Sequence, residues 1–147
     1  MTSLKWWLRI VGAFYLLLTL MNLWFLFFNP KVIGDQLPFP ANDLTIRAFS
    51  DAWLTFILEL GVIGAMMMYA ARDPAKSIIL VQTVIALEVV RGILDDIYLI
   101  ARGYDLGGYL AFIVLHLIII VTGVLFLRRA VVVAGSPERR LPISQKS

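Results

Sequence analysis

Seven polar side chains that could bind a ligand or transfer protons lie within long apolar segments of the sequence. They are Asn22, Asp51, Glu59, Glu88, Arg91, Asp95 and His116. A charged side chain at the centre of a bilayer costs about 2.5–3.5 kcal/mol on insertion scales, so such residues usually turn inward, pair, or line a wet cavity. We therefore expect these residues to form a buried polar core that binds a ligand.

The spacing of the acidic residues predicts which of them share a helix face. Glu88, Arg91 and Asp95 follow the i, i+3, i+7 pattern of a single α-helical stripe. Asp96 lies about 100° further around a regular α-helix, which places it only at the margin of that stripe. Asp51 and Glu59 are also expected to share a face of their own helix, because they lie about two helical turns apart.

Carboxylates close to a histidine suit acid–base chemistry. In a low-dielectric site such groups can relay protons, with His116 as the partner of an acid. A structural interpretation of each residue also stays open: Glu88 and Arg91 as an ion pair, His116 as a hydrogen-bonded helix contact, and Asn22 as an interhelical contact. The sequence has no cysteine, so thiolate metal sites and disulfides are excluded. We expect no metal and no cofactor.

The segments that carry these residues are long enough to cross a membrane. Hydrophobic residues make up 61% of the 147-residue chain, well above the roughly 45–50% of a soluble domain. A transmembrane helix needs about 20 mainly apolar residues, and four segments meet this condition: 5–28, 43–71, 75–102 and 108–129. We expect an all-α, antiparallel four-helix transmembrane bundle over residues 1–129, followed by a flexible cytoplasmic tail over 130–147.

The connections contain residues that end or begin helices. Asn29-Pro30 ends the first span, because proline cannot continue a helix. Asn42 or Asp43 is the expected N-cap of the second span. Gly61 and Gly64 are expected to allow close helix approach.

The distribution of Lys and Arg predicts the orientation. Nine basic residues lie at one side of the four spans: Lys5, Arg9, Arg72, Lys76, Arg128, Arg129, Arg139, Arg140 and Lys146. Three lie at the other: Lys31, Arg47 and Arg102. The positive-inside rule makes the first side cytoplasmic, so both termini are expected in the cytoplasm of a multi-pass protein of the bacterial plasma (inner) membrane. Measured from the opposite ends of their spans, Asn22, Asp51, Asp95 and His116 then share a depth in the outer half of the bundle.

Several segments resemble the BphX-like family of small bacterial membrane proteins. The resemblance is carried by the stretch from Leu87 to Tyr104, which reads LEVVRGILDDIYLIARGY, by Leu4–Tyr15, by Thr55–Ala65 around Glu59, and by VLHLI around His116 with Val121-Thr122-Gly123. The family takes its name from a gene beside biphenyl-degradation enzymes. The resemblance implies a four-helix architecture and a link with hydrophobic compounds, and it supplies no catalytic residues.

Several functions fit these observations. The first is a membrane protein that binds or helps handle a hydrophobic small molecule or lipid through the buried polar cluster. The alternatives are a membrane acid–base enzyme, isomerase-like, on a lipophilic substrate, a proton-coupled transporter built as a dimer, and an accessory subunit of a membrane complex. The expected partners are membrane lipids and a hydrophobic small molecule. A homodimer or larger complex stays open, and the basic residues lie at helix ends, so no nucleic acid is expected.

Overall fold

The computed structural model describes the backbone of residues 2–135, and it forms helices joined by short turns. The elements in chain order are α1 (Thr2–Phe28), α2 (Lys31–Asp35), α3 (Asp43–Ala70), η1 (Pro74–Ser77), α4 (Ile78–Leu87), η2 (Glu88–Leu94), α5 (Asp95–Ala101) and α6 (Leu106–Gly135). Residues 136–147, most of the predicted cytoplasmic tail, lie outside the described part.

Four of these helical segments are long and apolar enough to span a membrane. They are α1, α3, the continuous rod Pro74–Ala101 formed by η1, α4, η2 and α5, and α6. They pack against one another, which confirms the predicted all-α bundle of four transmembrane helices. The protein is therefore a multi-pass membrane protein.

The capping chemistry of α3 explains where this helix begins. The Asn42 side chain accepts a hydrogen bond from the backbone N–H of Thr45 at 2.9 Å, and the Thr45 hydroxyl oxygen accepts one from the backbone N–H of Asn42 at 2.8 Å. This reciprocal pair satisfies amides that a helix start leaves unpaired. The connection before it, predicted as a loop, also contains the short helix α2.

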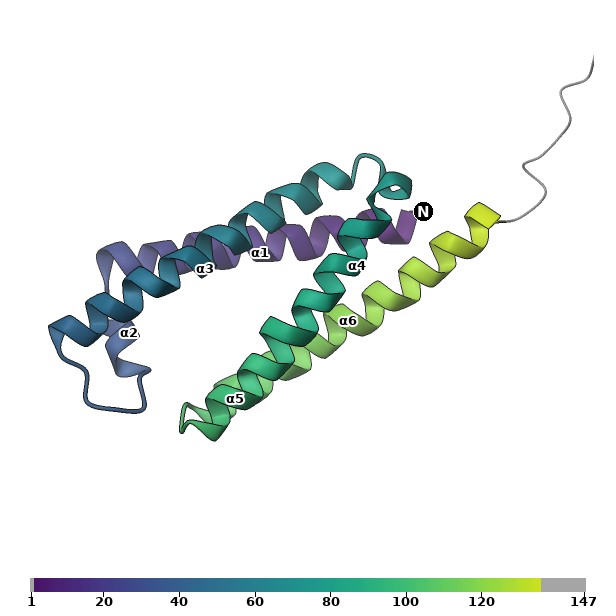
Figure 1. The fold of residues 1–147 in the computed structure, drawn as a ribbon. Helices are drawn as coiled ribbons and strands as arrows, with labels where there is room; N and C mark the ends of the chain where they lie inside the picture. The colour runs from purple at the N-terminus through teal and green to yellow at the C-terminus, as the bar shows by residue number, and fades with distance from the viewer. Residues whose placement is uncertain (1, 136–147) are drawn as a thin grey trace, which may run out of the picture.

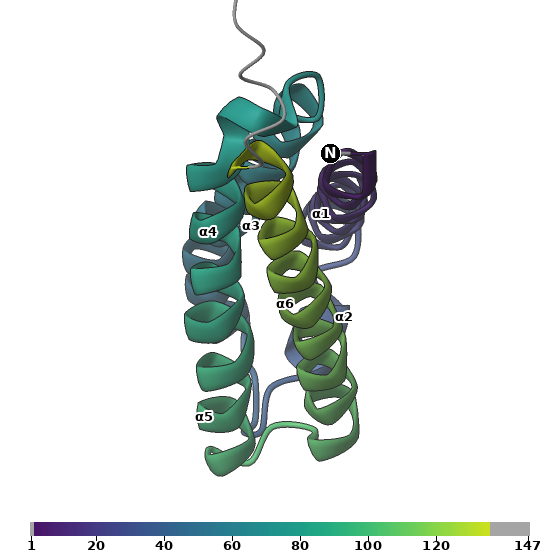
Figure 2. The same cartoon turned by 90° about the vertical axis from the view of Figure 1, so that its right-hand side faces the viewer.

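The four spans form two helix pairs. In the first hairpin α1 runs along α3, and in the second hairpin the Pro74–Ala101 rod runs along α6 (Figures 1 and 2). The two hairpins meet near the start of α1 and diverge toward α2 and the turn between α5 and α6 (Figure 1). We call these the closed end and the open end of the bundle. The close approach within the first hairpin depends on Gly64, where a Cβ atom would lie 2.9 Å from the carbonyl oxygen of Gly12.

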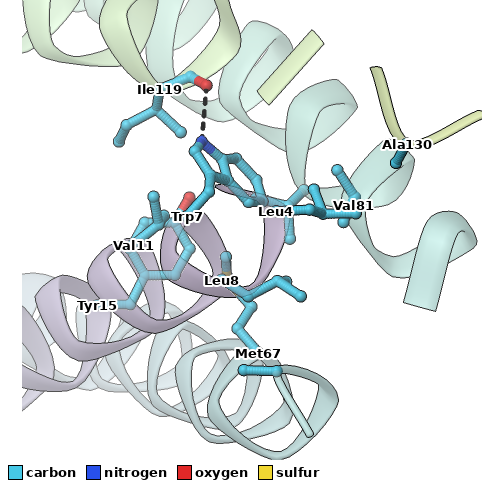
Figure 3. Packing of buried hydrophobic residues seen from close by; sticks show 11 residues of the cluster. Leu4, Trp7, Leu8, Val11, Tyr15, Met67, Val81, Ile119 and Ala130 are labelled. Atoms are coloured by element: carbon cyan, nitrogen blue, oxygen red, sulfur yellow. Dashed lines mark hydrogen bonds between the residues drawn. The ribbon is translucent and has the colours of Figure 1, made fainter. Parts of the chain in front are cut away.

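A cluster of buried apolar side chains fills the closed end. Leu4, Leu8, Met67 and Val81 are almost completely buried there, and Ala130 of α6 joins them (Figure 3). The start of α1 and the far end of α6 therefore lie at the same end of the bundle, as an even number of antiparallel spans requires.

Trp7 ties the two hairpins together beside this core. Its indole N–H donates to the Thr122 hydroxyl at 3.1 Å. The same N–H also donates to the carbonyl oxygen of Ile119 at 3.3 Å (Figure 3). The ring also packs on Gly123, where a Cβ atom would come within 2.8 Å of it. These contacts hold the two hairpins together at the closed end.

Candidate functional site

A cavity of about 740 Å³ lies between the two hairpins. All four spans contribute to its wall, and residues of the open end, including Gln36, Pro38 and Tyr104, contribute as well. The wall is mainly apolar and aromatic, and it also carries five carboxylic acids, Arg91 and His116. This size and lining match the pockets in which proteins bind small organic molecules.

The polar part of the wall centres on His116 of α6. Its Nδ1 lies 2.5 Å from the Glu88 carboxylate, and its Nε2 lies 3.6 Å from the Asp96 carboxylate. Glu88 is 3% exposed and Asp96 is 6% exposed. Two acids of the third span therefore flank both nitrogens of one imidazole, and an imidazolium ion there would face a carboxylate on each side.

A change of helix type brings these residues together. From Glu88 to Leu94 the backbone is a π-helix, whose hydrogen bonds reach one residue further than those of an α-helix. The wider turn shifts the inward face by about one position. Glu88, Gly92 and Asp96 are consequently the buried residues of this segment.

This shift corrects the expected position of Asp96. A regular α-helix would leave Asp96 at the margin of the polar face and Asp95 at its centre. In the structure Asp96 is buried beside His116, and Asp95 is an exposed residue that lines the cavity. The sequence contains no feature that predicts the π-helix. The adjacent acids Asp95 and Asp96 indicate only that one of the two could lie beside His116.

Gly92 leaves room for the His116 imidazole to pack directly against the backbone of the third span. A Cβ atom at this position would lie 2.5 Å from Cγ of His116 and 2.6 Å from its Nδ1. The Phe112 ring, one turn before His116 on α6, stacks beside the imidazole with centroids 6.4 Å apart. The absence of a side chain at Gly92 therefore allows the short contact between Glu88 and His116.

Arg91 forms an ion pair across the two hairpins. Its guanidinium lies 2.8 Å from the Glu59 carboxylate of α3. The guanidinium carbon Cζ also lies over the Phe56 ring, 5.5 Å from the ring centroid. The proposed ion pair of Arg91 with Glu88 is thus replaced by a longer-range pair with Glu59. Arg91 lines the cavity and Glu59 stands outside its lining.

Asn22 makes an interhelical contact, as expected for a polar residue in a membrane span. Its side-chain oxygen accepts a hydrogen bond from the Trp53 indole N–H at 3.2 Å, while its amide group donates to the carbonyl oxygen of Leu18 at 2.8 Å. Asn22 and Trp53 both line the cavity. Trp53 was not among the seven residues expected in the polar core.

The seven residues singled out in the sequence are therefore distributed unevenly around this cavity. Five line it: Asn22, Glu88, Arg91, Asp95 and His116. Glu59 is reached through Arg91. Asp51 is exposed and lies outside the lining. Within residues 2–135, no three His, Asp or Glu side chains are arranged to hold a metal ion.

Comparison with known proteins identifies the family. The family model described as BphX-like matches residues 1–132. An uncharacterized BphX-like protein of Burkholderia cepacia is 34% identical over 98 residues, covering 65% of this chain and 69% of the relative, and one from Paraburkholderia xenovorans (strain LB400) matches to the same extent. No solved structure gives a significant match. From the match over nearly its whole length, the chain belongs to the BphX-like family.

Proposed function

We propose that this protein binds a small hydrophobic molecule or lipid in the cavity between its two hairpins and assists its handling in the membrane. The observation that carries this proposal is the cavity of about 740 Å³ with the Glu88–His116–Asp96 cluster in its wall. An apolar pocket with a few convergent polar groups is the usual form of a small-molecule site. The apolar wall would hold the body of the ligand, and the cluster would orient its polar group.

The proposal includes an orientation in the bacterial inner membrane. Lys5, Arg9, Arg72 and Lys76 lie at or near the closed end, and Arg128 and Arg129 lie near the end of α6 that reaches it. The positive-inside rule favours the closed end in the cytoplasm. The cavity then faces the outer half of the bilayer, and both termini are cytoplasmic. A homodimer or a larger membrane complex is compatible with this arrangement.

Mass spectrometry of the purified protein tests the proposal. Leu18→Trp adds bulk inside the cavity, because Leu18 lines it, whereas Leu17→Trp places the same bulk on the outer surface, where Leu17 is 64% exposed. The wild type and Leu17→Trp should retain the same small molecule or lipid after purification in detergent, and Leu18→Trp should lose it. The proposal fails if the folded wild type retains no compound, or if Leu18→Trp retains it equally.

The position of His116 between two carboxylates supports a second candidate, a membrane acid–base enzyme with a lipophilic substrate. Glu88 would exchange a proton with His116 at the cavity wall, and both residues would act as general acid or base. Glu88→Gln separates the two candidates. In the enzyme the folded variant loses turnover of a retained compound while its binding is preserved. In a binding protein the folded variant has a lower affinity, and there is no turnover to lose.

A further inference from the structure

The charged groups around the cavity are unevenly balanced. The lining contains five carboxylic acids and two groups that can carry positive charge, Arg91 and His116. The acids are Asp35, Glu88, Asp95, Asp96 and Asp105. Arg91 is already paired with Glu59, which lies outside the lining. Asp35, Asp95 and Asp105 are exposed, whereas Glu88 and Asp96 are buried. Even with His116 protonated, Glu88 and Asp96 share one positive charge, so the wall of the cavity keeps an excess of carboxylates.

Asp96 supplies an independent sign of a missing partner. Its Oδ2 atom is buried and has no hydrogen-bond partner among the described residues, and the nearest positive group is His116 Nε2 at 3.6 Å. An unpartnered buried carboxylate oxygen is costly in a low-dielectric environment. Asp96 is 6% exposed and lines the cavity, so a ligand in the cavity can reach its neighbourhood.

The remaining wall suits the apolar part of a cation. Eight aromatic side chains line the cavity, among them Trp53, Phe56, Tyr109 and Phe112. Aromatic faces attract cations by about 0.5–2 kcal/mol each, most strongly where water is excluded. Arg91 over the Phe56 ring already shows this interaction at the edge of the site.

We propose that the cavity selects a lipophilic cation, such as a hydrophobic amine or a quaternary ammonium compound, whose charge is placed against Asp96 and Asp95. This inference rests on the proposed function and narrows its ligand class. A cation neutralises the excess carboxylates, whereas an anion of the same shape adds to their repulsion. A neutral molecule gains only the apolar contacts.

Two probes of the same shape and opposite charge test this inference. Tetraphenylphosphonium and tetraphenylborate each carry four phenyl rings around one central atom. Binding of each is measured by equilibrium dialysis to the full chain in phosphatidylcholine nanodiscs, with empty nanodiscs subtracted. We expect the phosphonium ion to bind one site per chain with an affinity at least about tenfold higher than that of the borate, equivalent to about 1.4 kcal/mol.

Variants locate the site of this preference. Asp96→Asn should lower the affinity for tetraphenylphosphonium about tenfold, and Asp95→Asn, at an exposed position that tolerates substitution, should lower it by a smaller factor. Asp43→Asn, in the first turn of α3 and outside the lining, should leave it unchanged. If Asp96→Asn does not fold, Asp95→Asn alone decides the question.

The failure of this inference differs from the failure of the proposed function. Equal or tighter binding of tetraphenylborate, or full phosphonium affinity in the folded Asp96→Asn and Asp95→Asn variants, overturns the cation preference. The binding function would still hold in that case if the wild-type protein retains a neutral compound that Leu18→Trp loses. If no compound is retained and neither probe binds, both are wrong.

Discussion

Glu88 and His116 are 28 positions apart in the chain, yet the Glu88 carboxylate and the His116 Nδ1 atom lie 2.5 Å apart between the third and fourth spans. Glu88 is almost fully buried, so this contact is formed away from bulk water. The same imidazole faces Asp96 through Nε2. One histidine thus joins the two helices of the second hairpin and presents a polar surface to the cavity.

Glu88→Gln should destabilise the fold. Glutamine keeps the shape and removes the charge, and hydrogen bonds to charged groups contribute about 1.5–3 kcal/mol. We expect a loss of that size in the free energy of unfolding, measured by titration with a denaturing detergent in mixed micelles. Asp51→Asn is the matched control, because Asp51 is exposed, and should change the free energy by less than about 0.5 kcal/mol. Equal losses in the two variants would contradict this role of Glu88.

Gly92→Ala should displace the His116 ring. The added Cβ atom would lie 2.5–2.8 Å from three ring atoms, and overpacking of this kind costs about 1–3 kcal/mol. The ring signals of His116 in an NMR spectrum should shift together with the loss of stability. Gly107→Ala is the control, because a Cβ atom there meets only Asp105 at 3.9 Å. Unchanged His116 signals in Gly92→Ala would contradict the packing described.

Arg91→Leu should cost more than the double substitution Glu59→Leu with Arg91→Leu. The single variant leaves the Glu59 carboxylate without its partner inside a membrane span, whereas the double variant removes both charges. A double-mutant cycle on the free energy of unfolding should give a coupling of about 0.5–3 kcal/mol. Strictly additive losses would show that the ion pair between the hairpins contributes nothing.

Deleting Val90 should convert the π-helix into an α-helix and preserve the inward face. Val90 is 57% exposed, and its removal places Gly92 and Asp96 at i+3 and i+7 from Glu88, the α-helical spacing of one face. The NMR signals of His116 should stay near their wild-type positions. Insertion of an alanine after Val90 is the contrasting variant, because it rotates Asp96 away from His116. If the deletion perturbs His116 as strongly as the insertion does, this account of the π-helix is wrong.

Single cysteines can test the orientation cleanly, because the chain has no native cysteine. Ala41→Cys lies at the open end and Ala75→Cys at the closed end, both at exposed positions. A membrane-impermeant maleimide added to cells with a permeabilised outer membrane should label Ala41→Cys, and it should label Ala75→Cys only after lysis. The reverse pattern would place the termini outside.

The bundle follows from the sequence because apolar length alone specifies a transmembrane helix. The inward positions of Glu88 and His116 are predictable for a similar reason, since the cost of charge in lipid leaves few alternatives. The position of Asp96 is not predictable from regular spacing, because the π-helix shifts the face by one residue. The partner of Arg91 is not predictable from spacing either, because Glu59 lies on another span and helical spacing relates only residues of the same span.

Photo-crosslinking in living cells tests the occupied cavity most directly. A benzophenone amino acid replaces Phe56, which lines the cavity, or Phe27, which is 64% exposed on the outer surface of α1. After irradiation, the intact mass of the Phe56-substituted protein should show one dominant adduct. The Phe27-substituted protein should show a broad mixture of membrane lipids. The same mixture at both positions, or no adduct at Phe56, would contradict the claim that the cavity binds a specific molecule.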